Sequence, residues 1–323
     1  MNSLTKSYSL ILDKYSLLKK KAVLRWILML PAAGCEYYKR TGGCTMCGFH
    51  TATRKYSHGF LWPSFAFKGL FKLAERSVHQ LMPNELFIFN GGSFLNEKEL
   101  PIGFQNYVFN FVGQSKNIDH LFIESRCEYI KESRLDKIAQ QLRGKRLSVG
   151  IGFESQDDYV RNTLIKKGLS KSHFEKTVKS LKDHGFDVKA YVFLKPLGLS
   201  EKQAFTETIN TIKYVLSVGV TEIDLSCAFV QEKTKMFDEF KSGIFQPPYL
   251  WTVLEIIKEV IKNNWPVSIG GFTDEPPPIA FPANCDECSP AIYRAIENFR
   301  STRVLLDVPN CSCREKWLKE MDF

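Results

Sequence analysis

Short, continuously apolar runs recur along the first two thirds of the chain, with segments of helical character between them. Six such runs occupy residues 24–30, 86–90, 120–124, 147–153, 188–194 and 222–226. A continuous apolar run, rather than an alternating one, is typical of strands that are covered on both faces in a parallel sheet. The intervening segments predict helices near 65–82, 132–143, 173–185 and 201–218. Six β–α repeats predict an α/β fold with a partial (β/α)6 barrel of the TIM type, with its chemistry at the carboxyl ends of the strands.

The two ends of the chain differ from these repeats. Near the N-terminus, apolar positions on one side predict a helix over 4–21. These positions are Leu4, Tyr8, Leu10, Ile11 and Leu17. Residues 1–22 are therefore expected to be an N-terminal helix. The barrel is then expected to span residues 23–245.

After residue 245, Gln246-Pro247-Pro248 interrupts the chain. A helix is predicted over 249–263 and a short strand over 267–270, and the proline-rich 274–278 segment cannot be regular structure. We expect residues 246–323 to form a small, cysteine-rich module rather than a seventh repeat.

Length and composition exclude several classes of protein. A chain of 323 residues with 44% hydrophobic and 24% charged residues can bury a full core, which excludes a disordered or fibrous chain. Lysine and arginine number 44 against 35 acidic residues, and the resulting charge of +9 is compatible with an anionic partner such as nucleic acid. No apolar run reaches the ~18 residues that span a bilayer, and the first residues lack a secretory pattern. The sequence therefore predicts a cytoplasmic protein without a membrane partner.

The nine cysteines fall into two clusters and two single residues. Their number is odd, and without a secretory signal a disulfide framework is not expected. Cys127 and Cys227 lack partners at ligand spacing and are expected to be small buried side chains.

The first cluster has the spacing C-x8-C-x2-C and comprises Cys35, Cys44 and Cys47. Three close thiolates without a fourth suit a [4Fe–4S] cluster with one open iron. A structural zinc is the alternative if His50 or His58 supplies the fourth ligand. The cluster follows the first predicted strand, at the mouth of the barrel. An open iron there can chelate S-adenosyl-L-methionine (SAM), and an enclosed barrel would shield the radical formed when SAM is cleaved.

The second cluster combines a C-x2-C pair with a C-x-C pair 22 residues later. Its members are Cys285, Cys288, Cys311 and Cys313. Four thiolates suit a structural zinc or an auxiliary iron–sulfur cluster, and the spacing alone does not decide between them.

In order and spacing, the first cluster and the strand ends that follow it resemble the radical SAM superfamily, in the branch of the elongator catalytic subunit. The resemblance implies that Asn90, Gly91, Gly92 and Ser93 contact the amino group of the SAM methionine, as the Gly-Gly-Glu-type motif of that superfamily does. It also implies that Glu124, in Glu-Ser-Arg, faces the SAM site.

Further candidates for the SAM site lie in the cysteine loop and beyond the later strands. Met46 and Ser155 are assigned to the SAM site, and Glu154, after the fourth strand, is a candidate for the ribose hydroxyls. Arg161 is a candidate for the SAM carboxylate, because a guanidinium suits a planar anion. Lys195, after the fifth strand, is expected to reach the site. No side chain is assigned a catalytic role of its own.

Over nearly the whole chain, the sequence is also similar to the archaeosine synthase β-subunit family. The similarity includes Gly34-Cys35, the glycines around Cys44 and Cys47, the 245–251 segment and the terminal cysteines. It implies that a partner transferase attaches lysine to a 7-cyano-7-deazaguanine base in tRNA. This protein, supplied by an electron donor, would abstract hydrogen from the lysine side chain and trigger C–N cleavage, leaving a formamidine base.

Two alternatives stay open at this point. The enzyme could act on a related 7-deazaguanine or another small substrate without tRNA. The chain could also be a zinc-bearing RNA-binding protein without radical chemistry.

Overall fold

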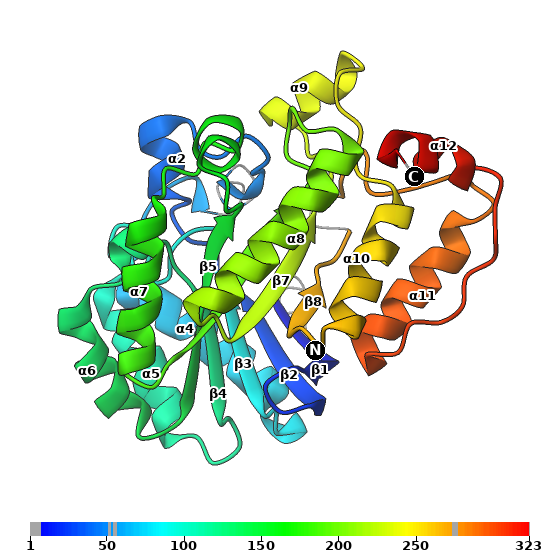
Figure 1. The fold of residues 1–323 in the computed structure, drawn as a ribbon. Coiled ribbons are helices and arrows are strands. Elements are labelled where there is room, and N and C mark those ends of the chain that lie inside the picture. Colours follow the sequence, from blue (N-terminus) through cyan, green and yellow to red (C-terminus); the bar gives the residue numbers. More distant parts are fainter. Residues whose placement is uncertain (1–7, 51–52, 54–56, 273–276, 323) are drawn as a thin grey trace. The chain divides into compact units, whose positions relative to one another are not determined.

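The computed structural model of the protein describes residues 8–50, 53, 57–272 and 277–322 (Figure 1). Contacts within the chain group these residues into two compact units. The first unit draws on residues 1–43, 49–152 and 172–189, and the second on 44–48, 153–171 and 190–323. The chain therefore passes between the units several times, and neither is one continuous segment.

Eight strands follow one another in the sheet in the order in which they occur along the chain. Their bounds are β1 Ser9–Ser16, β2 Lys21–Met29, β3 Glu85–Phe89, β4 His120–Glu124, β5 Arg146–Glu154, β6 Asp187–Leu194, β7 Glu222–Cys227 and β8 Val267–Ile269. In the first unit, β2, β3, β4 and β5 pair in parallel. The α/β fold and all six predicted strands are confirmed, and β4 has the predicted bounds.

Four helices occur where the sequence predicts them: α4 Ser64–Val78, α6 Glu132–Leu142, α7 Lys171–Asp183 and α8 Glu201–Val218. The start of α8 is a capping box, in which the Ser200 hydroxyl accepts the backbone N–H of Gln203 and the Gln203 side chain accepts the backbone N–H of Ser200. The helix ends at Gly219, whose φ of 98° requires the left-handed region.

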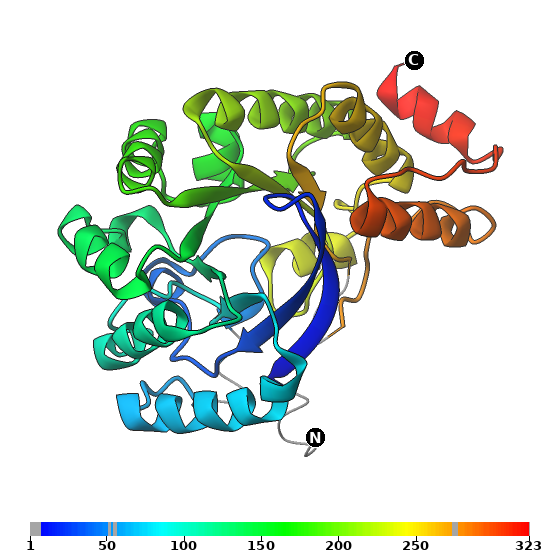
Figure 2. The same ribbon diagram turned by 90° about the horizontal axis from the view of Figure 1, so that it is seen from below.

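The predicted N-terminal helix is wrong in the described part of the chain. Residues 9–16 form β1, which pairs antiparallel with β2 in the hairpin drawn in blue in Figure 2. The indole N–H of Trp26 on β2 donates to the Ser9 hydroxyl at 2.9 Å. Residues 4–7 lie outside the described residues. Pairing with a neighbouring strand outweighs the helical spacing of Leu10, Ile11 and Leu17.

The sequence did not predict helix α5, Ile102–Gln114. Its aromatic residues and Gly113 have weak helix propensity, but its apolar side chains are buried. Phe104 packs against Phe71 of α4 with ring centroids 6.2 Å apart, and Phe71 lies 5.2 Å from Trp26. Burying each such ring stabilises the fold by about 1.5–3 kcal/mol, which exceeds the propensity cost. Two shorter helices, α2 Glu36–Thr41 and α9 Lys235–Lys241, were also not predicted.

The chain beyond residue 245 continues the β–α pattern before it changes. The predicted helix and strand are α10, Leu250–Lys262, and β8, and β8 pairs in parallel with β7. The expectation that no further repeat follows is therefore wrong, because the short apolar segment 267–269 adds a parallel strand to the sheet beside β7. Helices α11 Ser289–Thr302 and α12 Arg314–Met321 follow (Figure 1). Of the proline-rich 274–278 segment, residues 274–276 lie outside the described residues.

Among the described residues, no helix is both long and apolar enough to cross a membrane.

Candidate active site and metal centre

The three cysteines of the first cluster lie on either side of a short helix. Cys35 precedes α2 as its N-terminal cap, and α2 stops at Gly42, where φ is 83°. Gly43, with φ of 78°, continues the left-handed turn into Cys44 and Cys47. Two consecutive glycines permit this backbone at no steric cost, so the chain reverses directly before the second cysteine. All three thiols are partly exposed; Cys35 belongs to the first unit, and Cys44 and Cys47 belong to the second.

Within the second unit, the loop of Cys44 and Cys47 is tied down by its central threonine. The backbone N–H of Thr45 donates to the carbonyl of Ile165 at 3.0 Å, and its hydroxyl donates to the carbonyl of Leu164 at 2.9 Å. Cys44 and Met46 pack against a buried apolar cluster that includes Ile165. Cys44 therefore lies against a buried apolar surface, which suits an iron–sulfur cluster that must be shielded from water.

Within the first unit, Glu99 ties the Cys35 segment to the loop after β3. One carboxylate oxygen accepts the backbone N–H of Glu36 at 3.0 Å and the Asn96 amide at 2.9 Å. The other oxygen accepts the backbone N–H of Ser93. Burial raises the pKa of Glu99, and these three donors act against that rise. The sequence analysis missed this residue, because an acidic residue in the polar 96–99 loop has the pattern of a solvated turn.

The same loop approaches the first cysteine closely. A Cβ placed on Gly92 would lie 1.9 Å from a Glu99 carboxylate oxygen and 3.4 Å from the Cα of Cys35. The absence of a side chain at residue 92 therefore lets the loop after β3 reach Cys35. This contact brings together two segments that the sequence had assigned to one site.

The loop after β4 joins this arrangement through Ser93. The Ser93 hydroxyl accepts the backbone N–H of Arg126 at 3.1 Å, and the backbone N–H of Phe94 donates to the carbonyl of Glu124 at 2.7 Å. The guanidinium of Arg126 lies 3.8 Å from the ring centre of Tyr37, two residues after Cys35. The first unit thus brings Cys35, the Asn90–Ser93 loop and the Glu124 loop together at the carboxyl ends of neighbouring strands.

The side-chain amide of Asn90 is buried in this region. Its side chain is 1% exposed, and neither its amide nitrogen nor its carbonyl oxygen has a hydrogen-bond partner among the described residues. An unpaired buried amide costs about 1–3 kcal/mol. A polar ligand that both donates and accepts would remove this cost, and the amino and carboxylate groups of SAM have that chemistry.

Two further candidates lie together in the second unit: Glu154 is the last residue of β5, and Ser155 follows it. Glu154 is buried with φ of 71°, and one of its oxygens accepts from the Lys167 ammonium at 2.8 Å. The hydroxyl of Ser155 donates to Glu207 at 2.6 Å and accepts the backbone N–H of Asp157 at 3.1 Å. The positive φ at a non-glycine residue is strained, as is frequent at functional sites.

Arg161 has a different environment from the one the sequence predicts. Its side chain is fully buried, and it donates to the carbonyls of Leu169 at 2.7 Å, Ser155 at 2.9 Å and Gln156 at 3.2 Å, and to the carboxylate of Asp158. Burial lowers the pKa of Arg161. Four hydrogen bonds from its five N–H groups go to residues between 155 and 169, so the side chain stabilises that segment.

Lys195 follows β6 and is held by a buried acid. Its ammonium lies 2.6 Å from Glu201, which also accepts the backbone N–H of Tyr249 at 2.9 Å and the hydroxyl of Thr252. The indole N–H of Trp317 in α12 donates to Thr252 at 2.9 Å. A buried polar chain therefore runs from Lys195 through Glu201 and Thr252 to α12.

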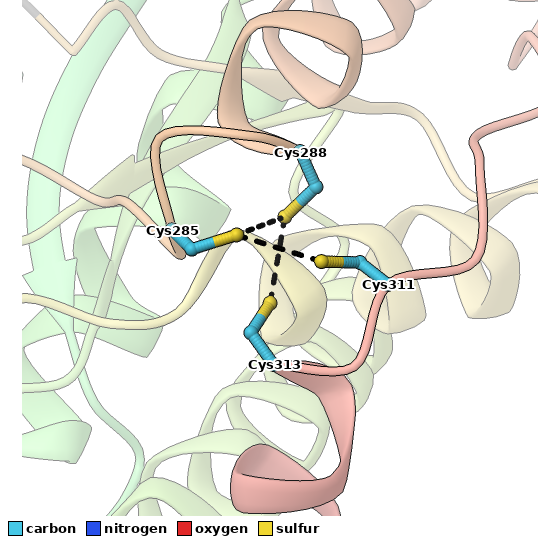
Figure 3. Close-up of side chains that lie close together, drawn as sticks. All are labelled: Cys285, Cys288, Cys311 and Cys313. Atoms are coloured by element: carbon cyan, nitrogen blue, oxygen red, sulfur yellow. Dashed lines mark hydrogen bonds between the residues drawn. The ribbon is translucent and has the colours of Figure 1, made fainter.

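The four C-terminal cysteines converge, as Figure 3 shows. Their sulfur atoms all lie within 4.8 Å of one another, which confirms that the predicted second cluster forms a site able to bind a metal. Cys288 caps the N-terminus of α11, and Cys313 caps that of α12. Hydrogen bonds from the backbone of Cys288 and from the side chains of the other cysteines lower the pKa of the Cys285 thiol to about 7.

The two single cysteines are buried, and the two histidines considered as zinc ligands have different environments. Cys127 is 2% exposed and Cys227 fully buried, as the sequence predicts, and burial raises the pKa of Cys227 to about 12. The ring of His50 stacks on Tyr38 with centroids 4.1 Å apart, and His58 is exposed.

Sequence comparisons identify relatives of similar length. No family model matches the chain. It is 30% identical over 298 residues to the uncharacterized protein MJ0550 of Methanocaldococcus jannaschii, covering 90% of this chain and 80% of that one. It is 27% identical over 306 residues to archaeosine synthase subunit beta of Methanosarcina acetivorans, covering 92% and 84%. The corresponding subunit of Thermococcus kodakarensis is 26% identical over 310 residues, covering 90% and 89%.

Solved structures share the fold. Elp3 of Methanocaldococcus infernus matches with a TM-score of 0.51 and 18% identity, over 71% of this chain and 58% of the Elp3 chain. This chain thus spans less than two thirds of Elp3. A radical SAM methyltransferase from Sphaerobacter thermophilus matches with a TM-score of 0.50 and 10% identity, over 78% of this chain and 70% of that one. The chain therefore belongs to the family of MJ0550, is similar to archaeosine synthase subunit beta, and shares the fold of Elp3 and of the radical SAM methyltransferase.

Proposed function

We propose that the chain is a radical SAM enzyme and a C–N lyase of tRNA modification, which cleaves a lysine adduct on a 7-deazaguanine base to form archaeosine. The relatives named archaeosine synthase subunit beta support this substrate, since they match at least 90% of the chain. The observation that carries the proposal is the approach of Gly92 to Cys35, because it places a glycine loop beside the first cysteine.

Cys35, Cys44 and Cys47 would hold the [4Fe–4S] cluster. Their thiols are partly exposed, and Cys44 adjoins an apolar cluster, which fits a cluster with one iron open to SAM. When bound and reduced, such a cluster would supply the one electron that splits the S–C5′ bond of SAM into methionine and a 5′-deoxyadenosyl radical. Such a reaction needs an electron donor, and the relatives' designation as a subunit is consistent with a lysine-transferase partner.

The side chains around the site would bind and orient SAM. The amide of Asn90 and the backbone of Gly91, Gly92 and Ser93 would engage the methionine end, with Glu124 beside them. In the second unit, Lys167 holds one oxygen of Glu154, which leaves the other oxygen to accept a ribose hydroxyl. Met46 would add to the apolar surface that excludes water from the reacting carbon.

For Ser155 and Arg161 we propose positioning roles. Ser155 is tied to Glu207, and Arg161 holds the carbonyls of Ser155 and Gln156. These bonds fix the backbone that carries Glu154, and this role for Arg161 takes the place of contact with the carboxylate of SAM.

The direct test supplies the reduced, reconstituted enzyme with SAM and tRNA that carries the lysine adduct. Mass spectrometry of the digested tRNA should show the formamidine base, and the Cys47→Ala variant should form none. A parallel reaction offers the same adduct as a free nucleoside. Conversion of the nucleoside alone would favour the small-molecule alternative, and SAM cleavage without conversion of either substrate would overturn the assignment.

Binding provides a second test of the tRNA substrate. The chain carries a net charge of +9, and a protein that neutralises several phosphates loses affinity steeply as salt increases. We expect the logarithm of the dissociation constant for tRNA to rise linearly with the logarithm of the salt concentration. A flat response would contradict a tRNA substrate. We propose radical chemistry rather than an RNA-binding protein without it, because the relatives named archaeosine synthase subunit beta cover at least 90% of the chain and the glycine loop lies beside Cys35.

A further inference from the structure

The distances between the sulfur atoms of the four-cysteine site, at the starts of α11 and α12, indicate whether it suits one metal ion or a cluster. Cys285 Sγ lies 3.6 Å from Cys288 Sγ and 3.5 Å from Cys311 Sγ, and Cys288 Sγ lies 3.5 Å from Cys313 Sγ (Figure 3). A tetrahedral zinc ion with Zn–S bonds of about 2.3 Å separates its ligand sulfurs by about 3.8 Å. A four-iron cluster puts a cube of iron and sulfide between thiolates that each bind a different iron, so it requires wider spacing.

We propose that Cys285, Cys288, Cys311 and Cys313 bind a single zinc ion, and that this ion holds α12 in place. The sulfur atoms point toward one another from two segments that are far apart in the sequence (Figure 3). Zinc accepts four thiolates in a tetrahedron, and it binds such sites more tightly than iron(II) does. This inference concerns a different site from the proposed lyase chemistry.

The surroundings of the sulfurs suit a bound, negatively charged centre. Four thiolates on a divalent ion carry two net negative charges. Cys288 and Cys313 stand at the N-termini of helices of 14 and 8 residues, where the helix dipole favours negative charge. The amide of Asn284 donates to Cys288 Sγ at 3.6 Å. Such outer hydrogen bonds are a regular feature of thiolate metal sites.

The position of α12 depends on this site. An isolated helix of this length is not stable in water, and the 304–310 segment that leads to it has no helix or strand. The contacts that hold α12 include the cysteines at its start and the buried side chain of Trp317, whose indole N–H donates to Thr252 at 2.9 Å. The hydroxyl of Tyr249 also donates to Glu320 of α12, at 2.8 Å. Since Thr252 donates to Glu201, the zinc site also supports the acid that holds Lys195.

The metal is tested on the full chain by elemental analysis and X-ray absorption. In the triple variant Cys35→Ser, Cys44→Ser, Cys47→Ser, the proposed iron ligands are removed. We expect this variant to retain one zinc per chain, bound to four sulfurs at about 2.3 Å, and no iron. Iron in the four-cysteine site, or no metal, would overturn the proposal, whereas loss of the lyase reaction alone would not affect it.

The role of the ion is tested on the protein with its native cysteines. Removal of zinc by a chelator should shift tryptophan fluorescence to longer wavelength as Trp317 becomes exposed, and added Zn²⁺ should reverse the shift. The Trp317→Phe variant should lose most of the response while it keeps its zinc. An unchanged spectrum after complete zinc removal would show that α12 does not depend on the metal, and would overturn this part of the proposal.

Discussion

The buried carboxylate of Glu99 accepts the backbone N–H of Ser93, and its second oxygen accepts the backbone N–H of Glu36. One side chain thereby connects the loop after β3 with the residue that follows Cys35. In the proposed site, these two segments bind the methionine end of SAM and one iron of the cluster. The relative position of both therefore depends on a residue that touches neither.

Replacement of Glu99 by glutamine tests this positioning role. Glutamine has one carbonyl oxygen, so its amide would face at least one of the N–H donors that Glu99 now satisfies. We expect a loss of about 1–3 kcal/mol in the free energy of unfolding, since one buried donor is left unpaired. Iron content after reconstitution should fall several-fold. Glu97→Gln is the control, because Glu97 is exposed and its closest cation, Arg134, lies 4.0 Å away. Equal iron content in both variants would refute the positioning role.

Gly92→Ala tests the close approach to Cys35. The added methyl group would displace the Glu99 carboxylate, whose oxygen lies 1.9 Å from the Cβ position. A displacement that costs about 1.4 kcal/mol in the transition state lowers the rate tenfold, and we expect at least this loss in 5′-deoxyadenosine formation.

The matched glycine is Gly69, which is exposed in α4 and has open space around its Cβ position. Gly69→Ala should leave SAM cleavage unchanged and should stabilise the fold by about 0.5–1 kcal/mol. If both variants cleave SAM at the wild-type rate, the approach of Gly92 to Cys35 has no functional role.

Asn90→Leu separates binding from stability. The substitution removes two buried polar atoms that have no partner among the described residues and keeps the branching of the side chain. Without SAM, the variant should unfold at a higher urea concentration, because the uncompensated polar atoms are gone. Its affinity for SAM, measured by calorimetry, should fall. A variant that is less stable and binds SAM normally would identify Asn90 as a structural residue.

Glu85, at the opposite end of β3 from the proposed site, makes stability depend on pH. Burial disfavours its charge, but hydrogen bonding to His120 and the charge of Arg25 outweigh burial and hold the pKa of Glu85 well below its ordinary value of 4.5. A lowered folded-state pKa adds stability that is complete above the unfolded pKa and is lost as the pH falls below it.

Glu85→Gln should therefore cost about 3–5 kcal/mol at pH 7, where it leaves Arg25 without its carboxylate partner. The difference from wild type in urea unfolding should shrink below a pH of about 4.5. Asp119→Asn, which changes an exposed acid near Lys19, should have a smaller effect at both pH values. A constant difference between pH 7 and pH 4 would rule out the proposed ionisation of Glu85.

The parallel part of the fold was predictable because continuous apolar runs carry their own signal. Strand β4 was predicted with its observed bounds. Strand β1 was not, because its identity depends on pairing with β2, whose residues are separated from it in the sequence. Helix α5 was missed for a related reason: its buried aromatic contacts with α4 outweigh the weak helix propensity of its sequence.

The candidate site shows the same division. Cysteine spacing and the glycine pair after β3 are sequence patterns with direct chemical meaning. They predicted both clusters, of which the structure brings the four C-terminal cysteines together, and they predicted the Gly92 loop that approaches Cys35. Glu99 has no such pattern, because its function depends on N–H groups contributed by Glu36 and Ser93. Arg161 shows the opposite case, since a residue chosen for its charge is engaged by nearby backbone carbonyls.

The most direct test of the central claim is SAM cleavage by the anaerobically reconstituted protein. With dithionite as reductant, the wild-type protein should be brown, contain about four irons in a thiolate-bound cluster and release 5′-deoxyadenosine. Cys47→Ala should lose the colour and the product, whereas Cys127→Ala, which changes a buried thiol outside both clusters, should keep both. A colourless wild-type protein that contains only zinc, or a Cys47→Ala variant that still cleaves SAM, would contradict the account.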